Sequence, residues 1–158
     1  MPSMSPADRW VAPFPNHDLH THTTWSDGAH TVPLTVLEAR AYELEAIAIT
    51  DHYFHGMPIA ESEEAFDRYL GEIEGARAGQ DEVLVLAGAE AAALDVTGRC
   101  SLDARHAERL EWVLCDLGGL SEGTLRNTPP DRATYAENVV RTYLGLCDVP
   151  YLDALAHP

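Results

Sequence analysis

The chain has 158 residues, of which 46% are hydrophobic, so it is long enough to bury one hydrophobic core. Its formal net charge of −16 disfavours binding to the phosphate backbone of nucleic acids. No apolar run approaches the roughly 18 residues of a membrane helix, which argues against a membrane partner. Residues 1–17 lack the pattern of a secretory signal, so we expect a cytoplasmic protein.

The first part of the chain predicts an irregular lead-in followed by a strand–loop–helix unit. Residues 1–15 contain four prolines and no periodic pattern, and we expect the folded domain to span residues 16–158. Residues 16–22 predict a short strand, which enters a polar loop with a turn signal at Ser26-Asp27-Gly28. Residues 33–44 carry apolar side chains at helical spacing and predict a helix.

The rest of the chain continues the alternation of strands and helices. The expected elements are, in order, a strand over 46–50, a helix over 61–78, a strand over 83–90, a hairpin turning at Thr97-Gly98, a short helix capped by Asp103, a strand over 112–117, a helix from Asp131 to Leu146, and a strand over 152–156. This order predicts an α/β fold, in which βα units surround a parallel sheet or barrel.

Candidate metal ligands lie where the predicted strands end. His20 and His22 are two residues apart on a strand, so both rings point to the same side, roughly 7 Å apart at the backbone. His52, Glu90 and His157 each stand at the end of a later strand. Because active sites of βα barrels assemble at the carboxyl ends of the strands, these side chains can converge. Imidazole and carboxylate together suit Zn, Fe or Mn.

Each of these residues also has an ordinary structural explanation. Two histidines in an HxH pattern are often surface residues, and a Glu after a strand is often solvated. The joint placement of His and Glu at four separate strand ends favours the metal site over these alternatives.

Four motifs resemble those of the PHP (polymerase and histidinol phosphatase) family. They are DLHTHTTWSDG, ITDH, GAE and LAHP, in this order, within residues 17–158. The resemblance implies a distorted (β/α)7 TIM-like barrel with two or three divalent metal ions, Zn, Mn or Fe. It also implies hydrolysis of a small phosphorylated substrate, a phosphomonoester or phosphodiester, by a metal-activated water.

The resemblance further assigns the ligands by matching position. His20 and His22 would bind the first metal, and Glu90 would bridge to a second, whose site His157 completes. Asp27 and His52 would belong to a third site. No catalytic residue is expected beyond the metal ligands.

Two departures from the family pattern stand out. Family members carry a histidine at the end of the fourth strand, where this chain offers Gly118 or Gly119, with Asp116 as the nearest replacement. The family also carries an Asp-x-His on its last strand, downstream of Pro158. We therefore expect a barrel that is incomplete at its C-terminus, whose open edge would be covered by self-association or by a complementing C-terminal chain.

Several other residues receive supporting roles. Asp18 and Asp51 are candidates for hydrogen bonds that orient the metal-binding histidines without contacting the metal. Arg99 and Arg126 are candidates for binding the substrate phosphate. His106, in a polar helix, is expected to be solvated. The cysteines Cys100, Cys115 and Cys147 are expected to be small buried hydrophobic residues.

Two other functions remain open from the sequence. The chain could be a non-catalytic remnant of the PHP type, or a partner-binding scaffold, as the glycines after the fourth strand favour. It could also be an amidohydrolase-type metal hydrolase, because those barrels also begin with an HxH strand. The spacing of the SDG and TDH motifs favours the PHP family over this last alternative.

Overall fold

The computed structural model describes residues 16–117 and 131–157 of the chain. Strands and helices alternate in this part, as predicted, and all pairings between its named strands are parallel. The strands are β1 (His17–Thr21), β2 (Ala46–Ile49), β3 (His52–Tyr53), β4 (Leu84–Ala92), β5 (Trp112–Asp116) and β6 (Ala154–Leu155). The helices are α2 (Val32–Ala41), the short 3-10 helix η1 (Pro58–Ala60), α3 (Glu63–Ala78), α4 (Ala104–Ala107) and α5 (Arg132–Leu146). The expected lead-in, residues 1–15, lies outside the described residues.

The central strand β4 pairs with three other strands. The sheet order is β1-β2-β4-β5-β6, and β3 pairs with β4 beyond the end of β2. Strands β2 and β3 form one extended segment that is interrupted at Thr50 and Asp51, whose side chains are both fully buried. The strand β3 was not predicted from the sequence, in which the predicted strand over 46–50 ends before His52.

The sheet is curled. The indole nitrogen of Trp112, on β5, donates a hydrogen bond of 2.9 Å to the carbonyl oxygen of Leu19, on β1. Two other strands, β2 and β4, separate β1 from β5 in the sheet, so this contact reaches across the concave side. The curl supports the expected barrel-like class.

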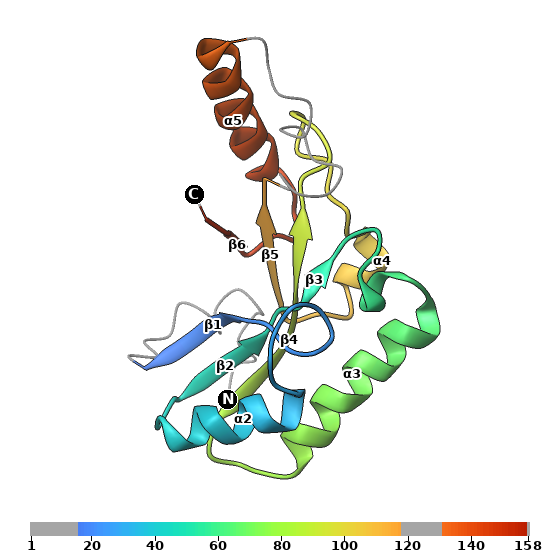
Figure 1. Ribbon diagram of the computed structural model, residues 1–158, viewed down its shortest axis with the longest axis vertical. Helices are drawn as coiled ribbons and strands as arrows, with labels where there is room; N and C mark the ends of the chain where they lie inside the picture. Colours follow the sequence, from blue (N-terminus) through green and yellow to red (C-terminus); the bar gives the residue numbers. More distant parts are fainter. Residues whose placement is uncertain (1–15, 118–130, 158) are drawn as a thin grey trace, which may run out of the picture.

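Helices α2 and α3 cover one side of the sheet. They pack against each other, α2 against β2 and α3 against β4 (Figure 1). The buried side of α3 consists of Ala65, Phe66, Tyr69 and Ile73, and the helix itself confirms the one predicted over residues 61–78. Because β2 and nearly all of β4 are buried, these strands read as continuous apolar runs in the sequence.

Three of the helices have a side chain that caps their N-terminus. Ser62 accepts a hydrogen bond from the backbone N–H of Ala65 at the start of α3. Asp103 and Asp131 each accept from the backbone N–H three residues further on, at the start of α4 and α5. These bonds satisfy N–H groups that lack a partner within the helix, and they confirm both predicted aspartate caps.

The prediction that His106 is solvated is wrong. The side chain is buried, its Nδ1 lies 2.8 Å from the hydroxyl of Tyr53, and its Nε2 lies 2.7 Å from Glu63 Oε1. Tyr53 and Glu63 come from β3 and α3, so tertiary packing covers a helix that is polar in sequence. Of the predicted buried cysteines, Cys115 is buried, Cys100 is half-buried and Cys147 is exposed.

The hairpin after β4 is present as a single antiparallel bridge between Ala93 and Cys100. No helix among the described residues is both long and apolar enough to span a membrane.

Candidate metal centre

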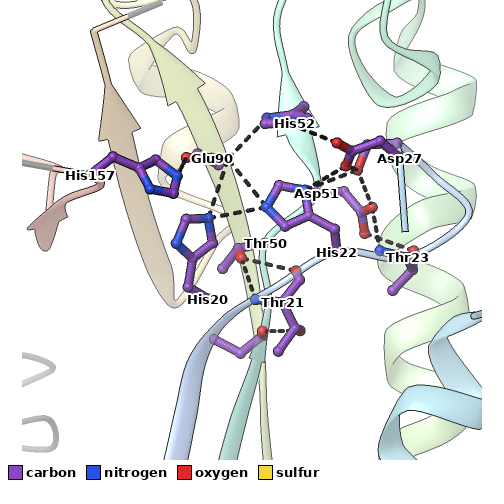
Figure 2. A network of polar contacts seen from close by, with 12 residues as sticks. His20, Thr21, His22, Thr23, Asp27, Thr50, Asp51, His52, Glu90 and His157 are labelled. Carbon is purple, nitrogen blue, oxygen red and sulfur yellow. Dashed lines mark hydrogen bonds and ion pairs between the residues drawn. The ribbon is translucent and has the colours of Figure 1, made fainter. Parts of the chain in front are cut away.

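Six predicted ligands line one cavity of about 470 Å³ at the carboxyl ends of the strands. They are His20, His22, Asp27, His52, Glu90 and His157. In a parallel sheet these strand ends meet at one edge, which explains why residues far apart in sequence converge here. Figure 2 shows the four histidines directed toward Glu90, with Asp27 beside His22 and His52.

The carboxylate of Glu90 lies at the centre of this cluster and is only 1% exposed. Its Oε2 lies 2.9 Å from His52 Nδ1, 3.2 Å from His22 Nε2 and 3.3 Å from His20 Nε2, and its Oε1 lies 3.4 Å from His157 Nε2. None of these contacts has hydrogen-bond geometry, so both oxygens lack a hydrogen-bond partner among the described residues. Buried charged oxygens without a partner are costly unless a cation compensates them.

Contacts within the cluster shift the pKa values of Glu90 and His52. Burial by itself would raise the pKa of Glu90, but the contacts with His22 and His52 and the charge of His20 outweigh it and hold the pKa well below its usual range. Contact with Glu90 raises the pKa of His52, against the opposing effect of burial, and the charges of Asp27 and Asp116 add to this increase. The contact between His52 and Glu90 therefore favours the charged form of both side chains.

Two groups of side chains have the geometry to hold a metal ion. One consists of His20, His22 and Glu90, the other of His22, Asp27 and His52, and the ligand atoms in each group lie within 4.8 Å of one another. The mixture of imidazole and carboxylate fits Zn, Fe or Mn. The unpartnered oxygens of Glu90 agree with this fit, because an ion between Glu90 and the histidines would satisfy them.

His157 reaches the cluster through an unusual backbone conformation. Its φ of 52° lies in the left-handed region, which costs about 1–2 kcal/mol for a residue with a side chain. The hydroxyl of Tyr143, on α5, donates a hydrogen bond of 3.1 Å to the carbonyl oxygen of His157. The ring is 70% exposed, at the rim of the cavity. Such strain is common where a backbone aims a functional side chain.

The two aspartates that were expected to orient the histidines, Asp51 and Asp18, differ in burial and in their hydrogen bonds. Asp51 is fully buried and accepts hydrogen bonds from the backbone N–H and the hydroxyl of Thr23, both at 2.8 Å, and from the hydroxyl of Ser26 at 2.6 Å. Asp18 is exposed and accepts a bond of 3.2 Å from the backbone N–H of His20, not from its ring.

The structure does not bring the candidate Arg99 to the site. Its side chain is exposed, pairs with Asp95 at 2.9 Å and does not line the cavity. Arg126, Gly118 and Gly119 lie outside the described residues. Sequence reasoning treated Ser26 only as part of a turn, although its hydroxyl lies 3.3 Å from His22 Nδ1. Its place four residues after His22, and next to the candidate ligand Asp27, was the available signal.

The sheet is parallel and curled, as in βα barrels, and a cluster of histidines and carboxylates lies at its strand ends. This combination is typical of metal-binding proteins with a barrel-type fold. The family model of the PHP domain matches residues 18–140 of the chain. The chain therefore belongs to the PHP domain family, as its motifs predicted.

Two relatives with known names are similar to this chain. A probable phosphatase of Acetivibrio thermocellus is 29% identical over 144 residues, which are 89% of this chain and 53% of that protein. The crystal structure of histidinol phosphate phosphatase from Lactococcus lactis, complexed with zinc, L-histidinol and phosphate, matches with a TM-score of 0.53 and 21% identity. That match covers 90% of this chain and 57% of the other. The chain thus spans about half the length of these relatives.

Proposed function

We propose that this chain is a metal-dependent hydrolase of phosphate esters. The observation that carries the proposal is the buried carboxylate of Glu90, which has two unpartnered oxygens and four histidine nitrogens within 3.4 Å. Family membership and the printed name of the Acetivibrio relative support the same reaction class. The Lactococcus protein, which has the same fold, contains zinc and phosphate.

In this proposal the cluster would hold two or three divalent ions, Zn, Mn or Fe. His20, His22 and Glu90 would hold one ion, and Glu90 together with His157 would hold a second. Asp27 and His52 would hold the third. Bound divalent ions lower the pKa of water and neutralise phosphoryl oxygens, which is the chemistry that phosphate-ester hydrolysis needs.

The side chains of the site would bind the ions and hold them in place, and the ions would neutralise the negative charge of the substrate. The lining residues of the cavity in residues 16–117 and 131–157 include two carboxylates, Asp27 and Glu90, and no arginine or lysine. A phosphate would be repelled by these carboxylates alone, so we propose that the substrate binds only to the metal-loaded protein. Burial of Glu90 keeps its side chain in a fixed position, and the left-handed backbone of His157 directs its ring to the rim of the cavity.

We further propose that the substrate is a small phosphorylated molecule. A cavity of about 470 Å³ is within the range of small-molecule sites. The net charge of −16 disfavours a nucleic acid. The curled parallel sheet fits the (β/α)7 type of barrel, and we propose that residues 16–158 form part of such a barrel.

A hydrolysis assay with matched variants tests the proposal. The chain is stripped of metal, reloaded separately with Zn²⁺, Mn²⁺ or Fe²⁺, and supplied with a panel of phosphomonoesters and phosphodiesters. We expect metal-dependent phosphate release that Glu90→Gln abolishes. The control Glu82→Gln removes an exposed carboxylate that pairs only with Arg40, and it keeps the activity.

The alternatives have distinct outcomes in the same assay. Stoichiometric metal binding without any turnover would overturn the proposal in favour of a non-catalytic scaffold. Hydrolysis of amides but not of phosphate esters would overturn it in favour of an amidohydrolase.

A further inference from the structure

The hydroxyl of Ser26 links the buried Asp51 to the ring of His22. Ser26 Oγ lies 2.6 Å from Asp51 Oδ1 and 3.3 Å from His22 Nδ1. On the other side of the ring, His22 Nε2 lies 3.2 Å from Glu90 Oε2 and 3.1 Å from His20 Nε2. Figure 2 shows His22 between Glu90 on one side and Asp51 with Asp27 on the other.

Asp51 is held firmly enough to serve as the anchor of this link. Its side chain is fully buried, and Thr23 donates to both of its oxygens, from the backbone N–H to Oδ1 and from the hydroxyl to Oδ2. The loop is tied to the same point, because the backbone N–H groups of Ser26 and Gly28 both donate to the carbonyl oxygen of Thr23. Ser26 therefore has little freedom to turn away from His22.

The number of available protons determines the direction of each hydrogen bond. A serine hydroxyl has one hydrogen to donate, and a carboxylate can only accept. The short contact with Asp51 takes the hydrogen of Ser26, so the hydroxyl oxygen can only accept from His22. Asp27 Oδ1, 3.0 Å from the same ring nitrogen, is also an acceptor. Every neighbour of His22 Nδ1 therefore requires a hydrogen on that nitrogen.

We propose that Ser26 is a positioning residue that fixes the tautomer of His22, with the proton on Nδ1 and the lone pair on Nε2. The lone pair then points into the group formed by His20, His22 and Glu90. A neutral imidazole has one lone pair, so His22 serves only this ion, and Nδ1 is excluded as a ligand of the ion beside Asp27 and His52. The importance of this tautomer for metal binding rests on the proposed function, but the hydrogen on Nδ1 does not.

The first test reads the tautomer directly. Long-range proton–nitrogen correlation spectra distinguish Nδ1–H from Nε2–H in ¹⁵N-labelled protein, and they apply both to the metal-free chain and to the diamagnetic zinc-loaded chain. We expect a hydrogen on His22 Nδ1 in both forms, with zinc on Nε2 in the loaded form. An Nδ1 without a hydrogen, or zinc on Nδ1, would overturn the proposal.

The second test measures the zinc affinity of matched variants by chelator competition. Ser26→Ala removes the acceptor, and we expect a 10- to 100-fold weaker affinity, as is typical when the partner of a ligating histidine is lost. Ser26→Thr keeps a hydroxyl at the same place and should restore the affinity to within about threefold. Thr24→Ala, in the same loop, removes an exposed hydroxyl and is the control.

The outcomes separate this inference from the proposed function. Wild-type affinity in Ser26→Ala, or failure of Ser26→Thr to restore it, would overturn the positioning role. A chain that binds no zinc would refute the proposed function, while the presence or absence of a hydrogen on Nδ1 in the metal-free spectrum would still decide this inference.

Discussion

His52 and Glu90 are register partners in the parallel ladder between β3 and β4, and His52 Nδ1 lies 2.9 Å from Glu90 Oε2. Partners on neighbouring strands direct their side chains to the same face of a sheet. Backbone pairing therefore places this histidine beside the buried carboxylate. The two-residue strand β3 therefore contributes to the site, because its pairing with β4 places two candidate ligands opposite each other.

Glu90→Gln should reduce stabilisation by metal. In the wild-type chain, each Zn²⁺ ion, at about 100 times its Kd, should raise the free energy of unfolding by about 2.7 kcal/mol. The amide keeps the shape of Glu90 but removes the charge that would hold the ion. Thermal unfolding followed by circular dichroism, with and without Zn²⁺, measures this difference. An equal shift in Glu90→Gln and in the surface control Glu82→Gln would refute the role of Glu90.

Gly28→Ala should displace the loop that carries Asp27. A Cβ at this position would lie 2.1 Å from the carbonyl oxygen of His22, which is a backbone atom and cannot turn aside. We expect a loss of about 1–3 kcal/mol in the free energy of unfolding and weaker metal binding. Urea denaturation of the metal-free chain gives the first quantity.

The matched control is Gly71→Ala, where an added Cβ meets no atom within 4 Å on a helix. It should stabilise the chain by about 0.5–1 kcal/mol. Similar effects of the two substitutions would show that the close approach at Gly28 does not exist.

Tyr69→Phe should destabilise the junction between α3 and the sheet. The fully buried hydroxyl lies 2.9 Å from the carbonyl oxygens of both Ile49, on β2, and Gly88, on β4. Its removal leaves buried carbonyl groups with fewer donors, and we expect a cost of about 1–2 kcal/mol. Urea denaturation measures it against Tyr42→Phe, an exposed tyrosine whose substitution should change stability by less than about 0.5 kcal/mol. Equal midpoints would contradict the expected cost.

His106→Ala should destabilise the chain although the residue does not line the cavity of the candidate ligands. The ring contacts the Tyr53 hydroxyl and Glu63, and its loss leaves the Tyr53 hydroxyl buried with one partner fewer. We expect a cost of about 2 kcal/mol in urea denaturation, and less than about 0.5 kcal/mol for the exposed control His55→Ala. Metal content should be unchanged in both variants, and a loss of metal in His106→Ala would mean that the cluster depends on β3 packing.

The sequence predicted the parts of the fold that depend on local patterns. The apolar runs at 46–50 and 83–90 became strands buried on both faces, and the aspartate caps at Asp103 and Asp131 begin helices. The convergence of the candidate ligands was also predictable, because parallel strands place their carboxyl ends at one edge.

Features that depend on tertiary contacts were not predictable. The strand β3 is two residues long, and only its pairing with β4 makes it a strand. His106 is buried by residues about 40 to 50 positions away in the sequence. The role of Ser26 depends on Asp51, which is 25 positions away, and no local pattern marks that contact.

The most direct test of the metal centre is elemental analysis of the purified chain after reloading and gel filtration, with His20→Ala analysed beside it. We predict two or more divalent ions per wild-type chain and fewer in the variant, because His20 is a ligand in the group with His22 and Glu90. A wild-type chain that retains only a trace of Zn, Mn or Fe, or a His20→Ala variant with undiminished metal, would contradict the account.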